Sequence, residues 1–283
     1  MKQKIYITFD LDFADYLNDN NHFDELESTF DILKNILCKY TKIKTTWFIR
    51  LDSQIEKLYG SPDHFFNKHK EKISWLLTNG HSIGWHHHSY TLDEKNRWIQ
   101  NTNEMMILEE LKKYGTIARS KGLNICRMGW GYHTNKTMKL VSELGFIIDS
   151  SAIPRPNYKW DLAKKDWSIS TCKWYYPSER DYRIEGQPSL KILEAPMTTT
   201  IISVESDTEP NVIRYLNPAY HEEIFQKTLK QTITFEKIVT VTHPYEFISN
   251  VKTHSLLSFN FKVFENNLKY IIDYLDADFE TLR

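Results

Sequence analysis

The sequence predicts an α/β fold in which helices cover a parallel β-sheet. Three observations lead to this prediction. Apolar or alternating runs of strand length recur along the chain, segments with helical spacing of apolar residues lie between them, and glycines such as Gly80, Gly122 and Gly145 end the helical segments. Strands that alternate with helices in this way are typical of parallel sheets. At 283 residues the chain is long enough for one α/β barrel, so its length does not require two domains.

The alternation begins with a strand at residues 4–11. There, Ile5, Ile7, Phe9 and Leu11 share one face while polar residues occupy the other, which is the pattern of a half-buried strand. The elements expected next are a polar loop at 13–23, a helix at 24–40, a strand at 43–49, a helix at 62–79 and a strand entering the histidine-rich stretch 80–90.

The middle of the chain continues the alternation and then breaks it. The elements expected are a helix at 93–121, a strand at 123–127, a turn at 129–131, a helix at 134–144 and a strand at 146–149. From 150 to 186 the pattern stops, and prolines stand among tyrosines and tryptophans. Because so long an irregular segment is uncommon in a compact chain, we interpret it as an aromatic-rich functional insertion loop in a single domain spanning 1–283.

The C-terminal part returns to regular elements. Those expected are strands at 190–194 and 198–204, a helix at 220–232, a buried strand at 238–242 and a closing helix at 256–275. The strand at 238–242 runs directly into His243 and Pro244, so it also ends in an ionisable residue.

Composition and charge exclude several classes of function. The chain carries 36 Lys and Arg against 37 Asp and Glu, so no bulk charge attracts nucleic acid or anionic lipid. No apolar run is long enough to span a bilayer, and the N-terminal residues reach an acid too soon for a secretory leader, so we expect a cytoplasmic protein. Cys38, Cys126 and Cys172 are odd in number and far apart, which favours buried thiols over disulfides or a thiolate zinc site.

The histidine-rich stretch is the first candidate for chemistry. Side chains in a strand alternate between faces, so His86 and His88 share one face and His87 lies on the other. Neutral imidazole is the commonest metal ligand, and a His-x-His pair at a strand end can present two nitrogens to one ion. The alternative is a polar turn whose histidines only form hydrogen bonds.

Other ionisable residues follow the predicted strands at the same end. They are Asp10 and Asp12 after the first strand, Arg127 and Asp149 after two middle strands, and His243 after the late strand. The carboxyl ends of parallel strands lie on one edge of an α/β sheet, where several strands can direct side chains to one point. Each residue alone has a structural explanation, but their coincidence at one edge predicts an active site.

Motifs in these regions also carry a resemblance. They are the segments 8–12 (TFDLD), 80–86 (GHSIGWH), 126–129 (CRMG), 144–151 (LGFIIDSS) and 242–244 (THP). In this order they resemble the motifs of the polysaccharide deacetylases, the NodB-like carbohydrate esterase family 4. The resemblance implies a distorted (β/α) barrel of about seven parallel strands, similar to a TIM barrel. It also implies an Asp-His-His site for a divalent metal, in the first place Zn²⁺.

The resemblance further implies a role for each residue. Asp10 matches the general base, Asp12 the metal carboxylate, His86 the first metal imidazole and His243 the general acid, while Arg127 paired with Asp149 would orient Asp10. Such a metal would polarise an acetyl carbonyl and lower the pKa of a water molecule. We therefore predict a metal-dependent hydrolase that removes an acetyl group from an N-acetylated or O-acetylated sugar or glycan precursor.

Two departures from the family pattern leave alternatives open. Leu11 separates two aspartates that are adjacent in the family, although a strand still keeps both on one face. The family's second metal histidine stands four residues after the first, where this chain has Tyr90. Facing favours His88 as the substitute, and His87 is the second choice if the chain bends. A non-catalytic carbohydrate-binding or regulatory protein on a decayed deacetylase barrel is therefore an alternative.

Another enzyme class competes for the first motif. The segment 9–12 also resembles the nucleophile strand of haloacid-dehalogenase-type phosphatases. However, Phe13 and Ala14 replace the Gly-Thr expected next, and this hypothesis leaves His86, His88 and His243 without a role.

Aromatic residues suggest how a sugar is held. Trp and Tyr rings stack on the apolar face of pyranose rings. Trp130, Trp160, Trp167 and Trp174 are the candidates in and near the insertion loop, and Tyr90 is a further one. The alternative for each is packing of the loop onto the barrel.

Overall fold

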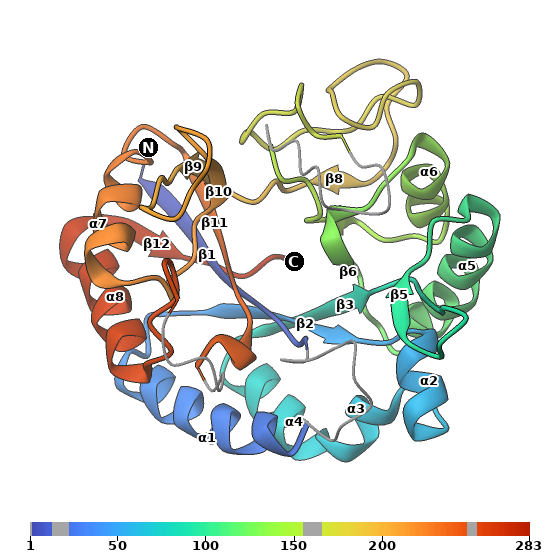
Figure 1. Cartoon of the computed structure of the whole chain (residues 1–283), viewed down its shortest axis with the longest axis horizontal. Coiled ribbons are helices and arrows are strands. Elements are labelled where there is room, and N and C mark those ends of the chain that lie inside the picture. Colours follow the sequence, from blue (N-terminus) through green and yellow to red (C-terminus); the bar gives the residue numbers. More distant parts are fainter. Residues whose placement is uncertain (1, 13–22, 155–165, 248–253) are drawn as a thin grey trace. The chain divides into compact units, whose positions relative to one another are not determined.

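The strand order confirms the predicted fold class. In the computed structural model the main sheet has the order β11-β1-β2-β3-β6-β7-β8, with β12 paired to β1 (Figure 1). The pairs of β1 with β11 and β12, of β3 with β6, and of β7 with β6 and β8 are all parallel. A run of seven parallel strands of this kind is consistent with a distorted (β/α) barrel.

The structure describes residues 2–12, 23–154, 166–247 and 254–283, with the backbone alone for 23–28. The predicted loop at 13–23, apart from Phe23, and Trp160 therefore lie outside the described residues. The described residues fall into two compact units, and the boundary lies within β2. Unit 1 contains residues 2–12, 23–46 and 197–281, and unit 2 contains residues 47–196 and 282–283, apart from the gaps given above. The prediction of a single domain over 1–283 stays a prediction.

Unit 1 is built on β1 and β11. Its strands are β1 (Gln3–Asp10), β9 (Thr199–Ile201), β10 (Ile213–Tyr215), β11 (Lys237–Thr242) and β12 (Ala277–Phe279). Its helices are α1 (Phe23–Lys39), α7 (Glu222–Lys230), α8 (Phe261–Tyr274) and the 3₁₀ turn η2 (Pro244–Phe247). Helices α7 and α8 lie side by side (Figure 1). Phe9 of β1 meets Phe264 of α8 edge to face at 6.0 Å, so the apolar face predicted for the first strand is buried under a helix.

Unit 2 carries the histidine-rich strand. The strands in or entering it are β2 (Thr45–Arg50), β3 (Ser82–His87), β4 (Tyr90–Leu92), β5 (Trp98–Gln100), β6 (Ile125–Met128), β7 (Ile148–Asp149) and β8 (Leu193–Glu194). Its helices are α2 (Ser53–Tyr59), α3 (His64–Lys68), α4 (Lys70–Thr78), α5 (Glu104–Ser120), α6 (Asn135–Glu143) and the 3₁₀ turn η1 (Gly129–Gly131). Its core includes Trp85 of β3, which stacks on Phe146 at 5.1 Å.

Several predicted elements differ from those observed. The helix expected at 62–79 is two helices that meet at His69, and the helix expected at 93–121 starts only at Glu104. The Asn103 side chain caps α5 by accepting the N–H groups of Met105 and Met106, and the residues before it form the β4–β5 hairpin. Helix α2 and strands β10 and β12 were not predicted, because these segments are too short to show a period.

In its described part, the predicted insertion loop forms isolated bridges rather than strands. Tyr175 pairs with Glu194 of β8, and Pro177 pairs with Glu185 within the loop. No helix in the described residues is long and apolar enough to cross a membrane.

Candidate functional site

The end of β1 brings two carboxylates next to a histidine in unit 1. The register of β1 on β11 pairs Phe9 with Thr242, so Asp10 and His243 follow at the same level. The Asp12 N–H donates to the Asp10 carbonyl at 2.9 Å, which keeps both residues at the strand end. His243 Nε2 lies 3.9 Å from Asp10 Oδ2 and 4.0 Å from Asp12 Oδ2. Since both carboxylates are nearly buried, their charges act strongly on the imidazole.

A carboxylate that the sequence analysis missed holds the other side of His243. Glu246 Oε1 lies 3.0 Å from His243 Nδ1, and Glu246 Oε2 accepts the His243 backbone N–H at 3.1 Å. Asn217 Nδ2 donates to Glu246 Oε2 at 2.8 Å and so fixes the carboxylate. Burial alone would lower the pKa of His243, but the charge and hydrogen bond of Glu246, with the charges of Asp10 and Asp12, raise it to about 9. His243 is therefore a cation at neutral pH and can donate a proton from Nε2. In the sequence, Glu246 follows His243 by three residues, and this spacing could have indicated the contact.

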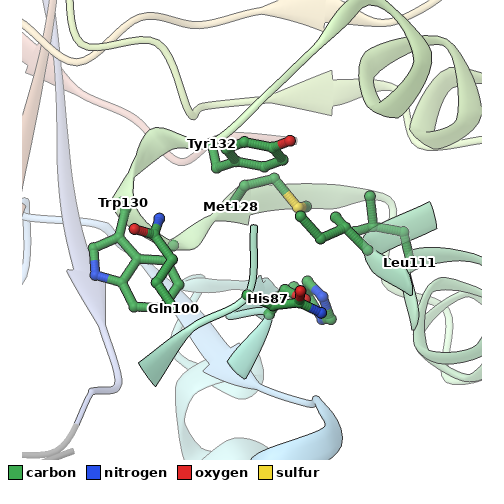
Figure 2. Close-up of a pocket in the computed structure, with 10 residues that line it drawn as sticks. His87, Gln100, Leu111, Met128, Trp130 and Tyr132 are labelled. Carbon is green, nitrogen blue, oxygen red and sulfur yellow. The ribbon is translucent and has the colours of Figure 1, made fainter. Parts of the chain in front are cut away.

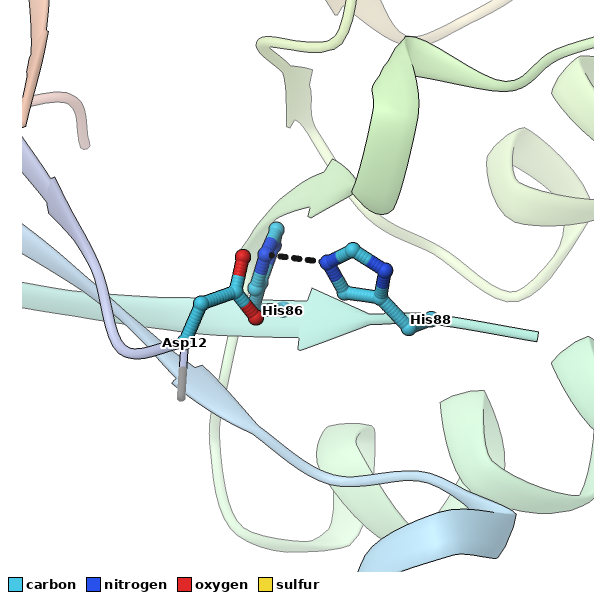
Figure 3. Close-up of side chains that lie close together, drawn as sticks. All are labelled: Asp12, His86 and His88. Carbon is cyan, nitrogen blue, oxygen red and sulfur yellow. Dashed lines mark hydrogen bonds between the residues drawn. The ribbon is translucent and has the colours of Figure 1, made fainter. Parts of the chain in front are cut away.

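The end of β3 brings two imidazoles together in unit 2. His86 Nδ1 lies 2.9 Å from the Arg127 carbonyl oxygen, so Nδ1 carries the proton and Nε2 carries the lone pair that a metal ion could use. His88 Nε2 lies 3.1 Å from His86 Nε2, and the two rings are almost perpendicular (Figure 3). Both residues are buried. Two lone-pair nitrogens in this arrangement can bind one cation between them.

His87 points away from this pair, as the alternation of a strand requires. Its Nε2 lies 3.9 Å from Glu110 Oε2 on α5, and burial lowers its pKa to about 3. The side chain borders a small pocket of about 10 Å³, room for about one water molecule (Figure 2). The pocket is lined by His87, Ser89, Gln100, Asn101, Ile107, Leu111, Met128, Gly129, Trp130 and Tyr132. Of the two candidates, His88 is therefore the one that shares the face of His86.

The ring of His88 is enclosed by its neighbours. Tyr90 stacks on it with 5.4 Å between ring centroids and an interplanar angle of 10°. The Trp130 ring lies nearly perpendicular to it with 4.3 Å between ring centroids, and a Cβ at Gly129 would overlap the imidazole. Trp130 adopts a left-handed φ of 54°, a strained value for a non-glycine residue that lets the chain turn tightly here.

Arg127 of β6 is buried, and its side chain binds Ser150, the residue that directly follows β7. Its Nε donates to the Ser150 carbonyl and its Nη2 to Ser150 Oγ, both at 2.8 Å. The guanidinium carbon lies 4.3 Å from the centre of the Phe48 ring. The Arg127 backbone carbonyl accepts the hydrogen bond from His86 Nδ1–H and so sets the tautomer of a candidate ligand.

Asp149 does not form the expected pair with Arg127. Its Oδ2 lies 3.3 Å from His133 Nε2, and its Oδ1 accepts the Ser151 hydroxyl at 2.7 Å. Burial favours the neutral form, but His133 holds the pKa of Asp149 well below its ordinary value. Burial and the charge of Asp149 raise the pKa of the neighbouring Glu194 well above its usual range. His133 and Glu194 were missed by the sequence analysis, since they come from a turn and a very short strand.

The aromatic candidates for sugar binding differ in how much of each side chain is exposed to solvent. Trp167 is 0% exposed and its indole N–H donates to the Gly131 carbonyl at 2.8 Å, so it supports the turn and cannot stack on a sugar. Tyr90 is 3% exposed and covers His88 instead. The expected substrate-binding roles of Trp167 and Tyr90 do not fit this burial, whereas Trp130 is partly exposed.

Comparisons with known proteins support the fold. No protein-family model and no curated protein matches the sequence. Among solved structures, a Mycobacterium smegmatis protein with a provisional assignment as a polysaccharide deacetylase is 16% identical, with a TM-score of 0.54 over 99% of this chain and 87% of that one. A family 4 carbohydrate esterase from Streptomyces lividans is 8% identical, with a TM-score of 0.42 over 98% and 91%.

An enzyme of another activity has a similar fold. The 4-α-glucanotransferase of Thermococcus litoralis is 10% identical, with a TM-score of 0.55 over 99% of this chain but only 39% of that one. The chain thus has a fold found in polysaccharide deacetylases, and the fold alone does not select the reaction.

Proposed function

We propose that this chain is a metal-dependent hydrolase that removes an acetyl group from an acetylated sugar. The observation that carries the proposal is the pair of buried imidazoles at the end of β3. Their Nε2 atoms are 3.1 Å apart, close to the separation of about 3.3 Å expected for two nitrogens at 2.0–2.1 Å from a tetrahedral Zn²⁺. The hydrogen bond that fixes the His86 tautomer is the support that metal-binding histidines need.

An aspartate and two histidines, Asp12, His86 and His88, make a candidate set of metal ligands, which Figure 3 draws. One carboxylate and two neutral imidazoles suit Zn²⁺ and leave positions open for water and substrate. A divalent cation held by these residues would act as a Lewis acid on the acyl carbonyl and lower the pKa of a water molecule.

The remaining residues supply the proton transfers. We assign Asp10 as the base that takes a proton from the attacking water, and His243 as the acid that protonates the leaving amine or hydroxyl. The raised pKa of His243, about 9, keeps it protonated at neutral pH. Glu246 holds the Nδ1 side of the ring, so Nε2 is the atom that donates.

The proposed substrate is an acetylated amino sugar or oligosaccharide. The partly exposed Trp130, next to the ring of His88, supports this class because an indole face stacks on a pyranose. A cytoplasmic location and Zn²⁺ as the native metal are also part of the proposal.

Acetate release from a panel of N-acetylated and O-acetylated sugars tests the function. We expect activity that a chelator abolishes, that Zn²⁺ restores, and that Asp10→Asn reduces by two or more orders of magnitude, about the contribution of a general base. Asp276→Asn is the matched control, because that carboxylate is 94% exposed. Full activity in Asp10→Asn would contradict the mechanism. Magnesium-dependent phosphate release instead of acetate release would favour the phosphatase alternative, and binding without turnover the carbohydrate-binding one.

A further inference from the structure

His88 lies just beyond the last residue of β3, so the strand does not by itself hold it in place. The last register pair of β3 with β6 is His87 with Met128. The His88 backbone N–H instead donates to Asp52 Oδ2 at 3.4 Å, and its ring stacks on Tyr90. One contact holds the backbone of His88 and the other holds its ring.

Arg50 joins these two contacts. It ends β2, is 0% exposed, and its Nε donates to the same Asp52 Oδ2 that accepts the His88 N–H. Its guanidinium carbon also lies 5.5 Å from the centre of the Tyr90 ring, within cation–π range. Its Nη2 donates to Gln54 Oε1 at 2.9 Å, which fixes the plane of the guanidinium group. Arg50 therefore touches two of the groups that contact His88, the Asp52 carboxylate and the Tyr90 ring.

Asp52 is itself fixed and charged. It caps helix α2 by accepting the Ile55 N–H on Oδ1 at 3.1 Å, so its position follows the helix. Burial favours the neutral acid, but the charge and hydrogen bond of Arg50 hold the pKa of Asp52 below its ordinary value. A hydrogen bond from a backbone N–H to an ionised carboxylate is stronger than one to a neutral acceptor.

We propose that Arg50, Asp52 and Tyr90 are positioning residues that fix the His88 imidazole for metal binding. The proposal rests on the proposed function, because it needs His88 to be a ligand. It explains why an ion pair is kept in the interior of unit 2, where apolar residues would cost less free energy. It also gives the buried Tyr90 a role in place of sugar binding.

Two variants and one matched control test this proposal by metal affinity. Asp52→Asn keeps the shape of the side chain and removes its charge, and Tyr90→Leu removes the stacked ring while leaving the Arg50–Asp52 pair. Asp93→Asn is the control, because Asp93 also pairs with an arginine, Arg97, and accepts backbone N–H groups in the same unit. The measurements are the Kd for Zn²⁺ by chelator competition and the visible spectrum of the Co²⁺-loaded protein, with circular dichroism to verify folding.

We expect Asp52→Asn and Tyr90→Leu to weaken Zn²⁺ binding by about 10-fold to 100-fold and to change the Co²⁺ spectrum, as substitutions behind a ligand do. Asp93→Asn should bind like the wild type. If Asp52→Asn does not fold, Tyr90→Leu decides. Wild-type affinity and spectrum in either folded variant would overturn the proposal while leaving the proposed function intact. A wild type that binds no divalent cation would overturn both.

Discussion

Replacing Glu246 by Gln should move the alkaline limit of activity to lower pH. Glu246 Oε2 accepts two N–H groups, from Asn217 and from the His243 backbone, and a Gln carbonyl can keep both. The Gln NH₂ then faces His243 Nδ1 and donates to it. This arrangement favours the neutral imidazole, so the pKa of His243 should fall from about 9 toward its ordinary 6.5.

The expected magnitude follows from these two pKa values. At pH 8 a group with a pKa of about 9 is roughly 90% protonated, whereas one with a pKa of 6.5 is only about 3% protonated. If His243 acts as the general acid, kcat/KM at pH 8 should fall by up to about 30-fold, with little change at pH 6. A cation near Asp12 would lower both pKa values alike and leave the difference between the two proteins.

The assay is the pH profile of kcat/KM for acetate release, from pH 5 to 10, in the wild type and in Glu246→Gln. Thermal unfolding of both proteins controls for loss of structure. A profile that falls equally at every pH would refute the reasoning, because a purely structural role of Glu246 would act in that way. An unchanged alkaline limit would refute it as well.

Three further predictions concern stability and the surroundings of His88. Since the pKa of His243 is raised on folding, it contributes stability that is fully present below pH 6.5 and is lost as pH rises through 9, about 3 kcal/mol in all. The free energy of unfolding, measured with urea at several pH values in this window, should fall with rising pH in the wild type and fall less in Glu246→Gln. An equal fall in both proteins would contradict the assignment. Trp167→Phe removes the hydrogen bond from the buried indole N–H to the Gly131 carbonyl and should lower the free energy of unfolding by about 1–2 kcal/mol without raising KM. A higher KM at unchanged stability would instead support a role of Trp167 in sugar binding. Gly129→Ala places a methyl group against the His88 ring and should weaken Zn²⁺ binding more than it lowers the melting temperature, and unchanged affinity would show that the ring is free to move.

The sequence was sufficient to place those site residues whose positions depend on side-chain alternation within a strand or on the end of a strand. The facing rule selects His88 over His87 because it depends only on the pleat of β3, and the structure has His88 beside His86. Residues that follow neighbouring parallel strands lie at the same edge of the sheet. The register of β1 on β11 therefore brings Asp10 and His243 to one level.

Partners that come from turns could not be predicted in this way. Asp149 faces His133, which lies in the turn after β6, and no period relates these positions in the sequence. The pairing of Asp52 with the His88 backbone depends on how helix α2 follows β2, and this seven-residue helix is too short to show a helical pattern. Trp167 shows the same limit, because a tryptophan in an irregular segment can face a sugar or the core, and only its burial distinguishes the two.

Metal uptake by a matched pair of histidine variants tests the central claim most directly. The two residues are neighbours in the chain and both are buried, but their side chains point to opposite sides, and only His88 has a proposed role as a ligand. We predict that the wild type and His87→Gln bind about one equivalent of Zn²⁺ per chain, and that His88→Gln loses most of this affinity. Uptake that survives in His88→Gln and is lost in His87→Gln, or a wild type that binds no metal, would contradict the account.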